Sequence, residues 1–348
     1  MPTRDRLLAV LVAVCWGLNF PAIHLSLEQF PPFFLVALRF TLIAVPTVLL
    51  VPRPAAPWRW VALYGLGFGV LQFAFLYLAM SSGMPTGLAS LVLQSSAPFT
   101  VLLAAALLRE RITARQGAGV LLAVAGLTGI ALYRAGEAGG AALVPVLLTL
   151  CGGLGWALGN LGSRLAGRAQ PGEPLRLMLW MSVVPPLPLL LLSLAFEGPA
   201  RIAGSFQGLG STQGLLALGG LAFTVVVATL VGSGLWSALM GRHPSSTVAP
   251  FSMLVPVVGI GASWLLLDER TSPTELACGA LVVAGVLLGS TRRRRAAPRG
   301  DAATTNDGPP ERGDARRDST RMTRDGEEPH SRRALRAWGS STGGSGGI

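Results

Sequence analysis

Ten apolar runs, each long enough to form a membrane-crossing helix, dominate this sequence of 348 residues. A helix needs roughly 20 apolar residues to cross a bilayer core of about 30 Å. Only 13% of the residues are charged, against about 25% in an ordinary soluble domain. The sequence therefore predicts an all-α integral membrane protein with ten transmembrane helices. The predicted spans are 7–27, 33–51, 59–80, 86–108, 114–133, 143–166, 175–195, 214–239, 246–267 and 274–291.

Arginine is distributed unevenly over the connections between these spans. All 28 Lys and Arg positions hold arginine, and cytoplasmic loops of membrane proteins carry the excess of basic residues. With a cytoplasmic N-terminus, the outer connections carry only Arg134, Arg201 and Arg270. The inner connections and the tail carry the remainder, apart from Arg39 inside the second span. We therefore expect both termini to be cytoplasmic, and the basic balance requires no nucleic-acid partner.

Residues 292–348 differ in composition from the rest of the chain. They are rich in Arg, Asp, Gly, Thr and Ser, and such a segment cannot bury enough apolar surface to offset its chain entropy. The sequence predicts a disordered, Arg-rich cytoplasmic tail over this range.

The ten spans contain a weak internal repeat. Leu108-Arg109-Glu110-Arg111 resembles Leu267-Asp268-Glu269-Arg270 at an offset of 159 residues. Five spans per half would make the second half enter the membrane upside down, as in the inverted repeats of many secondary transporters. The predicted repeats are 5–135 and 142–291. Pro98 and Pro256 fall inside spans at matching places, where we expect helix kinks that serve gating or simply face lipid.

The polar residues inside the spans are almost all uncharged. The nine acidic residues before the tail fall at span ends or in connections, so the interior favours a neutral or zwitterionic solute. Amides, hydroxyls and indoles within apolar runs should face the protein interior because an unpaired polar group in hydrocarbon costs free energy. The predicted lining of a substrate cavity, with ordinary interhelical bonding and packing as the alternative, is Trp16, Asn19, Gln72, Gln94, Trp156, Asn160, Trp236 and Ser252.

Two ionisable residues lie within or near the ends of spans. His24 is a candidate for a proton-sensitive or substrate-carboxylate contact, because histidine ordinarily changes charge near neutral pH. The alternative is an interfacial side chain that reaches water. Arg39 is a candidate anion contact, or else a structural anchor that pairs with Glu28, the His24 loop or lipid phosphate.

Motifs for enzyme or ATPase chemistry are missing from the sequence. There is no His-Glu-x-x-His motif and no Gly-x-x-x-x-Gly-Lys-[Ser/Thr] phosphate loop. The three cysteines lie singly in apolar runs without metal-ligand spacing. We expect no cofactor and no metal, with a small-molecule substrate and the lipid bilayer as partners of a monomer or homodimer. A membrane-embedded enzyme and a channel or receptor remain as more remote alternatives.

Several segments carry a resemblance to a known family. Trp16-Gly17-Leu18-Asn19-Phe20, residues 83–94, residues 248–259 and Leu265-Leu-Leu-Asp-Glu-Arg270 resemble the EamA branch of the drug/metabolite transporter superfamily. The resemblance covers about residues 5–290 and departs at His24, where the family often has Lys.

The resemblance implies a ten-helix exporter in the bacterial inner membrane that works by alternating access. Its implied substrates are amino acids or related metabolites, with O-acetylserine and cysteine among them. Efflux of another solute, such as an aromatic amino acid, a purine or a lipophilic drug, stays open.

Overall fold

The computed structural model describes residues 1–137, 140, 142–243 and 245–290. These residues are helical and contain no strand, as the sequence predicts. Ten helical segments are long and apolar enough to cross a membrane, and they are numbered here span 1 to span 10 in chain order. They are Thr3–Leu27, Pro32–Leu50, Trp58–Ser81, Thr86–Leu108, Ala114–Gly136, Leu143–Ala169, Pro174–Phe196, Thr212–Arg242, Ala249–Leu267 and Pro273–Ser290. The predicted tail lies outside the described residues.

Five of the ten spans, numbers 1, 2, 5, 6 and 10, are single α-helices. Span 1 is α1 (Thr3–Leu27), span 2 is α2 (Pro32–Leu50), and spans 5 and 6 are α7 (Ala114–Gly136) and α8 (Leu143–Ala169). Span 10 is α16 (Pro273–Ser290), and the short helix α11 (Pro199–Gly204) lies in the connection between spans 7 and 8. Large apolar side chains project outward from these helices, with Leu49 75% and Leu121 72% exposed, as a lipid-facing surface requires.

Spans 3 and 8 each contain a π-helical stretch. Span 3 runs through α3 (Trp58–Tyr64), the π-helix η1 (Gly65–Gln72) and α4 (Phe73–Ser81). Span 8 runs through α12 (Thr212–Ala222), the π-helix η4 (Phe223–Ser233) and α13 (Gly234–Arg242). Such stretches are rare in proteins, and those that occur are often found at functional sites.

Span 4 is interrupted by a 3₁₀ turn, and span 9 begins with one. Span 4 consists of α5 (Thr86–Val92), η2 (Leu93–Ser95) and α6 (Ser96–Leu108). Span 9 follows α14 (Ser245–Val248) and consists of η5 (Ala249–Met253) and α15 (Leu254–Leu267).

Pro98 and Pro256 are the third residues of the helices that follow these turns. Because proline has no amide hydrogen, it cannot bond the carbonyl four residues earlier, which belongs to Gln94 in one span and Ser252 in the other. Those carbonyls instead accept hydrogen bonds from amides only two residues later, those of Ser96 and Leu254. The irregular turn therefore precedes the proline in both spans.

Span 7 differs from the sequence prediction of one uninterrupted helix over 175–195. It is divided into α9 (Pro174–Met181) and α10 (Pro186–Phe196). Consecutive prolines at 185 and 186 remove two amide donors, so the helix cannot continue through them. The backbone at Gly69 in η1 packs directly against the ring of Pro185, which places the break beside the π-helix of span 3.

The same helix ends recur 159 residues apart. Helices α6 and α15 are followed by Arg109 and Asp268, which cap them in the left-handed conformation with φ of 55° and 53°. The next helices both begin with a capping box, in which side chain and backbone of two residues bond reciprocally. It is formed by Thr113 and Gln116 at α7 and by Ser272 and Glu275 at α16.

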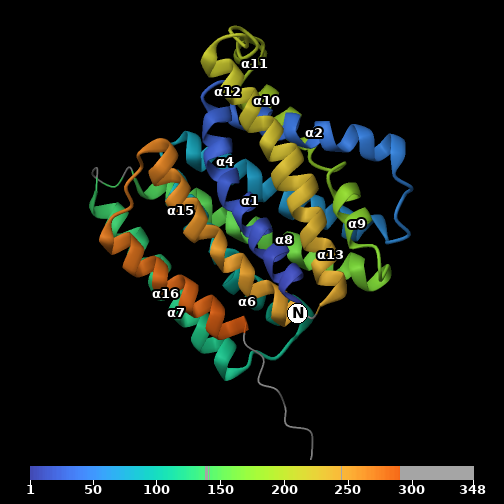
Figure 1. The fold of residues 1–348 in the computed structure, drawn as a ribbon, viewed down its shortest axis with the longest axis vertical. Coiled ribbons are helices and arrows are strands. Elements are labelled where there is room, and N and C mark those ends of the chain that lie inside the picture. The colour runs from blue at the N-terminus through green and yellow to red at the C-terminus, as the bar shows by residue number, and fades with distance from the viewer. Residues whose placement is uncertain (138–139, 141, 244, 291–348) are drawn as a thin grey trace, which may run out of the picture. The chain divides into compact units, whose positions relative to one another are not determined.

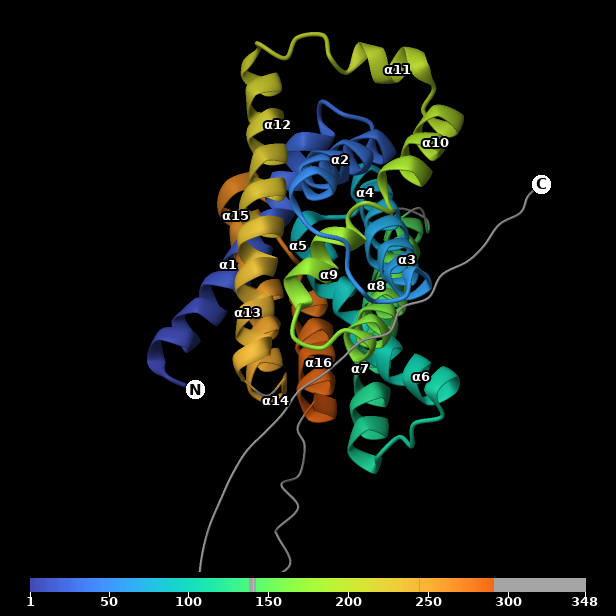
Figure 2. The ribbon, with the colours of Figure 1, turned by 90° about the vertical axis from the view of Figure 1, so that its right-hand side faces the viewer.

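The packing of the spans follows a regular scheme (Figure 1; Figure 2). Span 1 packs on spans 8 and 9, and span 6 packs on spans 3 and 4. Span 5 packs on span 10, and span 2 packs on the α10 part of span 7. If each span is replaced by its counterpart five places along the chain (span 1 by span 6, span 2 by span 7, and so on), the same set of contacting pairs results. At the α7–α16 contact, a Cβ on Gly119 would lie 2.5 Å from the carbonyl oxygen of Gly285, so only small residues permit this approach.

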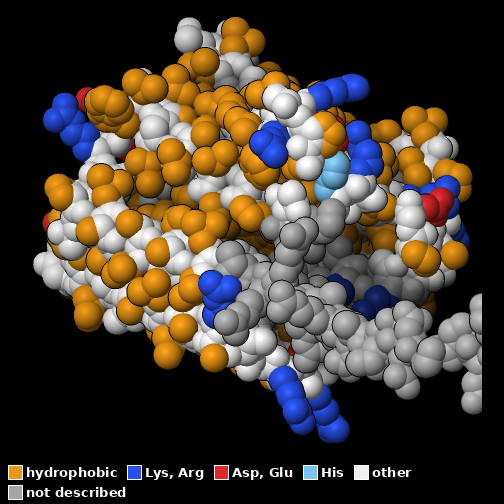
Figure 3. Space-filling model, turned by 60° about the horizontal axis from the view of Figure 1, so that its bottom comes forward, with side chains coloured by type: hydrophobic (Ala, Val, Ile, Leu, Met, Phe, Trp, Pro, Cys, Tyr) orange, Lys and Arg blue, Asp and Glu red, His pale blue; other side chains and the backbone are white. Residues whose placement is uncertain are grey.

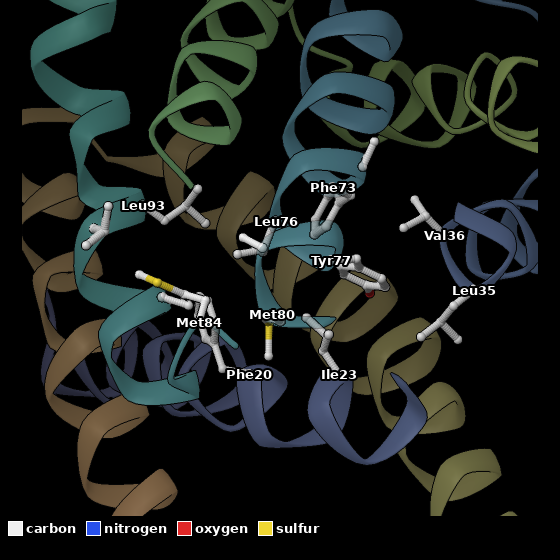
Figure 4. Close-up of a cluster of buried hydrophobic side chains, with 14 of the residues drawn as sticks. Phe20, Ile23, Leu35, Val36, Phe73, Leu76, Tyr77, Met80, Met84 and Leu93 are labelled. Carbon is white, nitrogen blue, oxygen red and sulfur yellow. The ribbon is translucent and has the colours of Figure 1, made fainter. Parts of the chain in front are cut away.

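Buried apolar side chains from four helices converge in the interior (Figure 4). They come from α1, α2 and α4, from the turn η2 of span 4, and, for Met84, from the loop that precedes span 4. Those labelled in the figure are Phe20, Ile23, Leu35, Val36, Phe73, Leu76, Tyr77, Met80, Met84 and Leu93.

Candidate substrate site

A buried arginine lies between three spans. The side chain of Arg39, on α2, is roughly 10 Å along the helix from its first residue at 1.5 Å per residue, and the residue is 4% exposed. Its Nη1 donates to Tyr77 Oη at 3.0 Å and its Nη2 donates to Thr229 Oγ1 at 2.8 Å. The guanidinium carbon lies 4.0 Å from the centre of the Phe73 ring. The guanidinium is thus held by a phenol, a hydroxyl and an aromatic face.

This placement corrects the expected partners of Arg39. Its side chain bonds neither Glu28 nor the His24 loop and does not reach the outer surface, so it is not a lipid-phosphate anchor. The ion pairs found within the described ranges do not include Arg39. Its Nε has no hydrogen-bond partner among these residues.

A row of aromatic rings extends from Arg39 along span 3. Successive ring centres are 5.8 Å apart from Tyr64 to Phe68, 5.5 Å from Phe68 to Phe73 and 5.9 Å from Phe73 to Tyr77. Nine residues make about 2.5 turns of α-helix, which would put Phe73 opposite Tyr64. The wider π-helical turn restores the alignment, so η1 keeps the four rings on one face. Trp156 of span 6 packs edge-on against Phe68, with ring centres 6.0 Å apart.

Several buried polar atoms in the spans have no partner in the described part of the chain. They are Asn19 Oδ1, Gln72 Oε1, Ser95 Oγ and Thr224 Oγ1. Asn19 is 8% and Gln72 is 3% exposed, and both were predicted to line the cavity. An unsatisfied buried polar atom costs about 1–3 kcal/mol. Water or a polar solute that bonds these atoms would recover that free energy.

The predicted tryptophans belong to two separate contacts. Trp16 and Trp236 lie together with ring centres 5.1 Å apart, and Trp16 Nε1 donates to the carbonyl of Ala228 in η4 at 3.0 Å. Trp156 belongs instead to the aromatic row of span 3. A further tryptophan, Trp180 in α9, donates to the carbonyl of Pro52 in the loop before span 3.

Gln94 and Ser252 lie in the two 3₁₀ turns, and these turns meet. Gln94 Nε2 lies 3.5 Å from the sulfur of Met253. Ser252 bonds only its own turn, at the carbonyl of Ala249. Asn160 joins span 6 to span 4 through a 3.1 Å bond to Thr100 Oγ1, which is the interhelical role given above as the alternative.

Most of this chain matches a known family of transporters. The model of the EamA-like transporter family matches residues 6–132 and 143–291. The chain belongs to the EamA-like transporter family. It is therefore a multi-pass membrane protein of a transporter family, as the sequence resemblance indicated.

Two curated relatives are similar over nearly their whole length. A protein of Escherichia coli (strain K12) is 38% identical over 83% of this chain and 95% of its own, and one of Salmonella typhimurium (strain LT2) is 41% identical over the same shares. Both are named "Probable amino-acid metabolite efflux pump". A "Probable terminal-alkyne amino-acid exporter" of Streptantibioticus cattleyicolor is 29% identical over 85% of this chain and 95% of its own.

A solved crystal structure supports the fold alone. It aligns with a TM-score of 0.55 and 21% identity, over 83% of this chain and 96% of that chain.

The two ends of this EamA-like fold are fastened by different polar contacts. At the start of α1, Asp5 Oδ2 lies 2.6 Å from His243 Nε2, and Asp5 Oδ1 lies 3.6 Å from Arg242. Figure 3 shows arginine side chains and a histidine around this face. At the other end, Glu269 accepts bonds from the amides of Thr86 and Gly87 at 2.7 and 3.3 Å.

His24 has a modest environment in this EamA-like chain. Its Nε2 lies 3.6 Å from Glu28 Oε1, one helical turn later, and its side chain is 36% exposed. Residues 1–137, 140, 142–243 and 245–290 contain no cluster of three or more His, Cys, Asp or Glu side chains that could hold a metal ion.

Sequence reasoning missed Tyr77, Thr229 and Phe73, the partners of Arg39. The available signal was an arginine well inside an apolar run with no acidic residue in the middle of any span. A charge in that position needs partners, and hydroxyl and aromatic groups from other spans provide them here.

Proposed function

We propose that this chain is a secondary exporter of amino acids or related small metabolites, with O-acetylserine and cysteine among the candidates. It acts in the bacterial inner membrane with both termini in the cytoplasm. The observation that carries the proposal is the near-full-length similarity, at 38% and 41% identity, to two proteins named as amino-acid metabolite efflux pumps. A zwitterion also suits an interior that offers a cationic guanidinium and unpaired amide oxygens.

We infer that export proceeds by alternating access between two inverted five-helix repeats, 5–135 and 142–291. The recurrence of left-handed helix ends and capping boxes at an offset of 159 residues supports the repeat. So does the packing scheme, which is unchanged when each span is exchanged with its counterpart. In this mechanism one repeat rocks against the other around a site between them, and the irregular turns before Pro98 and Pro256 act as the points of bending.

The proposed cavity includes Trp16, Asn19, Gln72, Gln94, Trp156, Asn160, Trp236 and Ser252. Asn19 and Gln72 have the strongest support, because their buried amide oxygens have no partner among the described residues. Asn160 has the least, because its amide already bonds Thr100.

This function is tested by measuring the metabolites in the medium of bacteria that overexpress the full chain. We expect a rise in O-acetylserine, cysteine or another amino acid in the medium, and a much smaller rise with the Asn19→Ala, Gln94→Ala double variant at equal membrane abundance. Ser205→Ala, in the loop after α11, serves as a matched control. If aromatic amino acids, purines or a drug appear instead, the solute is of that class. No change in any of them would contradict an export function.

A further inference from the structure

Arg39 is a buried cation whose bonding is incomplete. A guanidinium offers five N–H donors, and the bonds to Tyr77 and Thr229 use two of them. The Nε donor has no partner within the described segments, and none of the carboxylates there forms an ion pair with Arg39. Buried charges in proteins are otherwise paired with an opposite charge.

The neighbours of Arg39 hold it in place without neutralising it. Tyr77 and Thr229 are neutral acceptors, and the Phe73 ring interacts with the flat face of the cation at 4.0 Å. The N–H of Nε and one N–H on each Nη are not used by these bonds, and the N–H donors of a guanidinium match the two oxygens of a carboxylate. Tyr77 is 1% and Thr229 is 5% exposed, so a carboxylate that binds here would be sheltered from bulk water.

The two neutral partners belong to counterpart spans in the two halves of the chain. Tyr77 lies in span 3 just after the π-helix η1, and Thr229 lies in the π-helix η4 of span 8. Thr229 Oγ1 in turn donates to the carbonyl of Thr224, five residues earlier, which is the spacing of a π-helical turn. The Arg39 side chain thus joins α4 of span 3, just after its π-helix, to the π-helix of span 8.

We propose that Arg39 binds the carboxylate of the transported solute and that the solute replaces Thr229 as a partner of the guanidinium. This inference rests on the proposed function, because it takes an amino-acid-type solute as the cargo. Binding then releases the link between spans 3 and 8, which gives the solute a direct effect on the packing of the two repeats. The site selects solutes with a carboxylate and disfavours the corresponding amines.

Exchange of radiolabelled L-cysteine by the purified full chain in liposomes tests the inference, with L-cysteine and cysteamine as competitors. Cysteamine keeps the amine and the thiol but lacks the carboxylate. For the wild type we expect L-cysteine to compete at least tenfold better than cysteamine. Arg39→Gln should weaken L-cysteine by tenfold or more and bring the two competitors within about twofold of each other.

Two further variants separate solute binding from a structural role. Arg134→Gln removes another partly buried arginine, one that pairs with Glu275, and it should leave the preference for L-cysteine over cysteamine unchanged. Thr229→Val frees a donor of Arg39 and should strengthen L-cysteine binding about three- to tenfold, the effect of one hydrogen bond. A purely structural Arg39 would lose function with Thr229→Val, and this variant decides the matter even if Arg39→Gln does not fold.

The outcomes distinguish this inference from the proposed function. If the wild type exchanges none of the twenty amino acids or O-acetylserine when each is loaded in turn, the proposed function fails and this inference fails with it. If the wild type exchanges any of them while Arg39→Gln and Thr229→Val keep its apparent affinity and its preference over the decarboxylated amine, only the role of Arg39 is overturned.

Discussion

Spans 4 and 9 occupy corresponding places in the two halves of the chain, but the segments that open them pack differently. All seven residues of α5 are buried, and this helix packs along α15 and α1. The 3₁₀ helix η5 has no fully buried residue and contacts α1, α14, α15 and α16. The segment that opens span 4 is therefore fully buried, whereas the segment that opens span 9 is only partly buried.

The glutamates near the two segments also differ in how they are bonded. Glu269 is bonded to the first amides of α5 and to the Thr86 hydroxyl at 2.9 Å. Its counterpart Glu110, 159 residues earlier, has a side chain that is 41% exposed and bonds Arg164 at the molecular surface. In a transporter that alternates between two states, contacts of this kind must form in one half as the equivalent contacts break in the other. Under the proposed alternating access, these are the contacts that would open and close during a transport cycle.

The largest expected effect comes from removing the fastening of α5. Glu269→Ala leaves the amides of Thr86 and Gly87 unbonded, and hydrogen bonds to a charged group contribute about 1.5–3 kcal/mol. We expect a cysteine introduced at Ser90 to react with a maleimide roughly ten to a hundred times faster in this variant. Glu110→Ala is the control, with a change of a fewfold at most because exposed ion pairs contribute little. Equal effects of the two variants would remove the contrast between the ends.

An intermediate effect should follow from enlarging Gly87. A Cβ at this position would lie 3.1 Å from the Cα of Ile260, so Gly87→Val forces α5 away from α15. Overpacking of this kind costs about 1–3 kcal/mol, and we expect a lower thermal unfolding temperature of the purified protein. Gly117→Ala, where the nearest atom is 4.0 Å away, should leave that temperature unchanged or raise it. An unchanged temperature for Gly87→Val would mean that α5 is not tightly packed.

The smallest effects concern the two capping boxes. Thr113→Ala and Ser272→Ala each remove one helix cap, which costs about 1 kcal/mol. We expect similar small decreases in unfolding temperature. Glu275→Ala should cost more than Gln116→Ala, because Glu275 also lies 3.6 Å from Arg134. Opposite signs for the two serine and threonine variants would weaken the case for equivalent halves.

The spans could be predicted from the sequence because their length and composition are set by the bilayer. The position of each residue around its helix could not, since packing decides it. Arg39 was identified as a candidate, but its partners come from spans 3 and 8 and depend on the π-helical turns of η1 and η4. Composition gives no rule for those turns. The break of span 7 had a visible cause in Pro185 and Pro186, yet the apolar run concealed it.

The predicted cavity residues also differ in how far the sequence could place them. Asn19 and Gln72 are buried with an unpaired oxygen, in keeping with a general rule about amides in apolar runs. Whether an amide is left over or used between helices depends on a neighbour such as Thr100, which bonds Asn160. That neighbour is distant in sequence and is known only from the structure.

The most direct test of the account is to label two cysteines in the presence and absence of solute. In a background without Cys15, Cys151 and Cys278, Ser90→Cys and Ser252→Cys are each treated with a maleimide, with and without O-acetyl-L-serine. Without solute, we expect the cysteine at 252 to react at least tenfold faster. With solute, the rate at 90 should rise as the rate at 252 falls. If both rates move together, or neither changes while solute is transported, the two segments do not exchange their packing and the account is wrong.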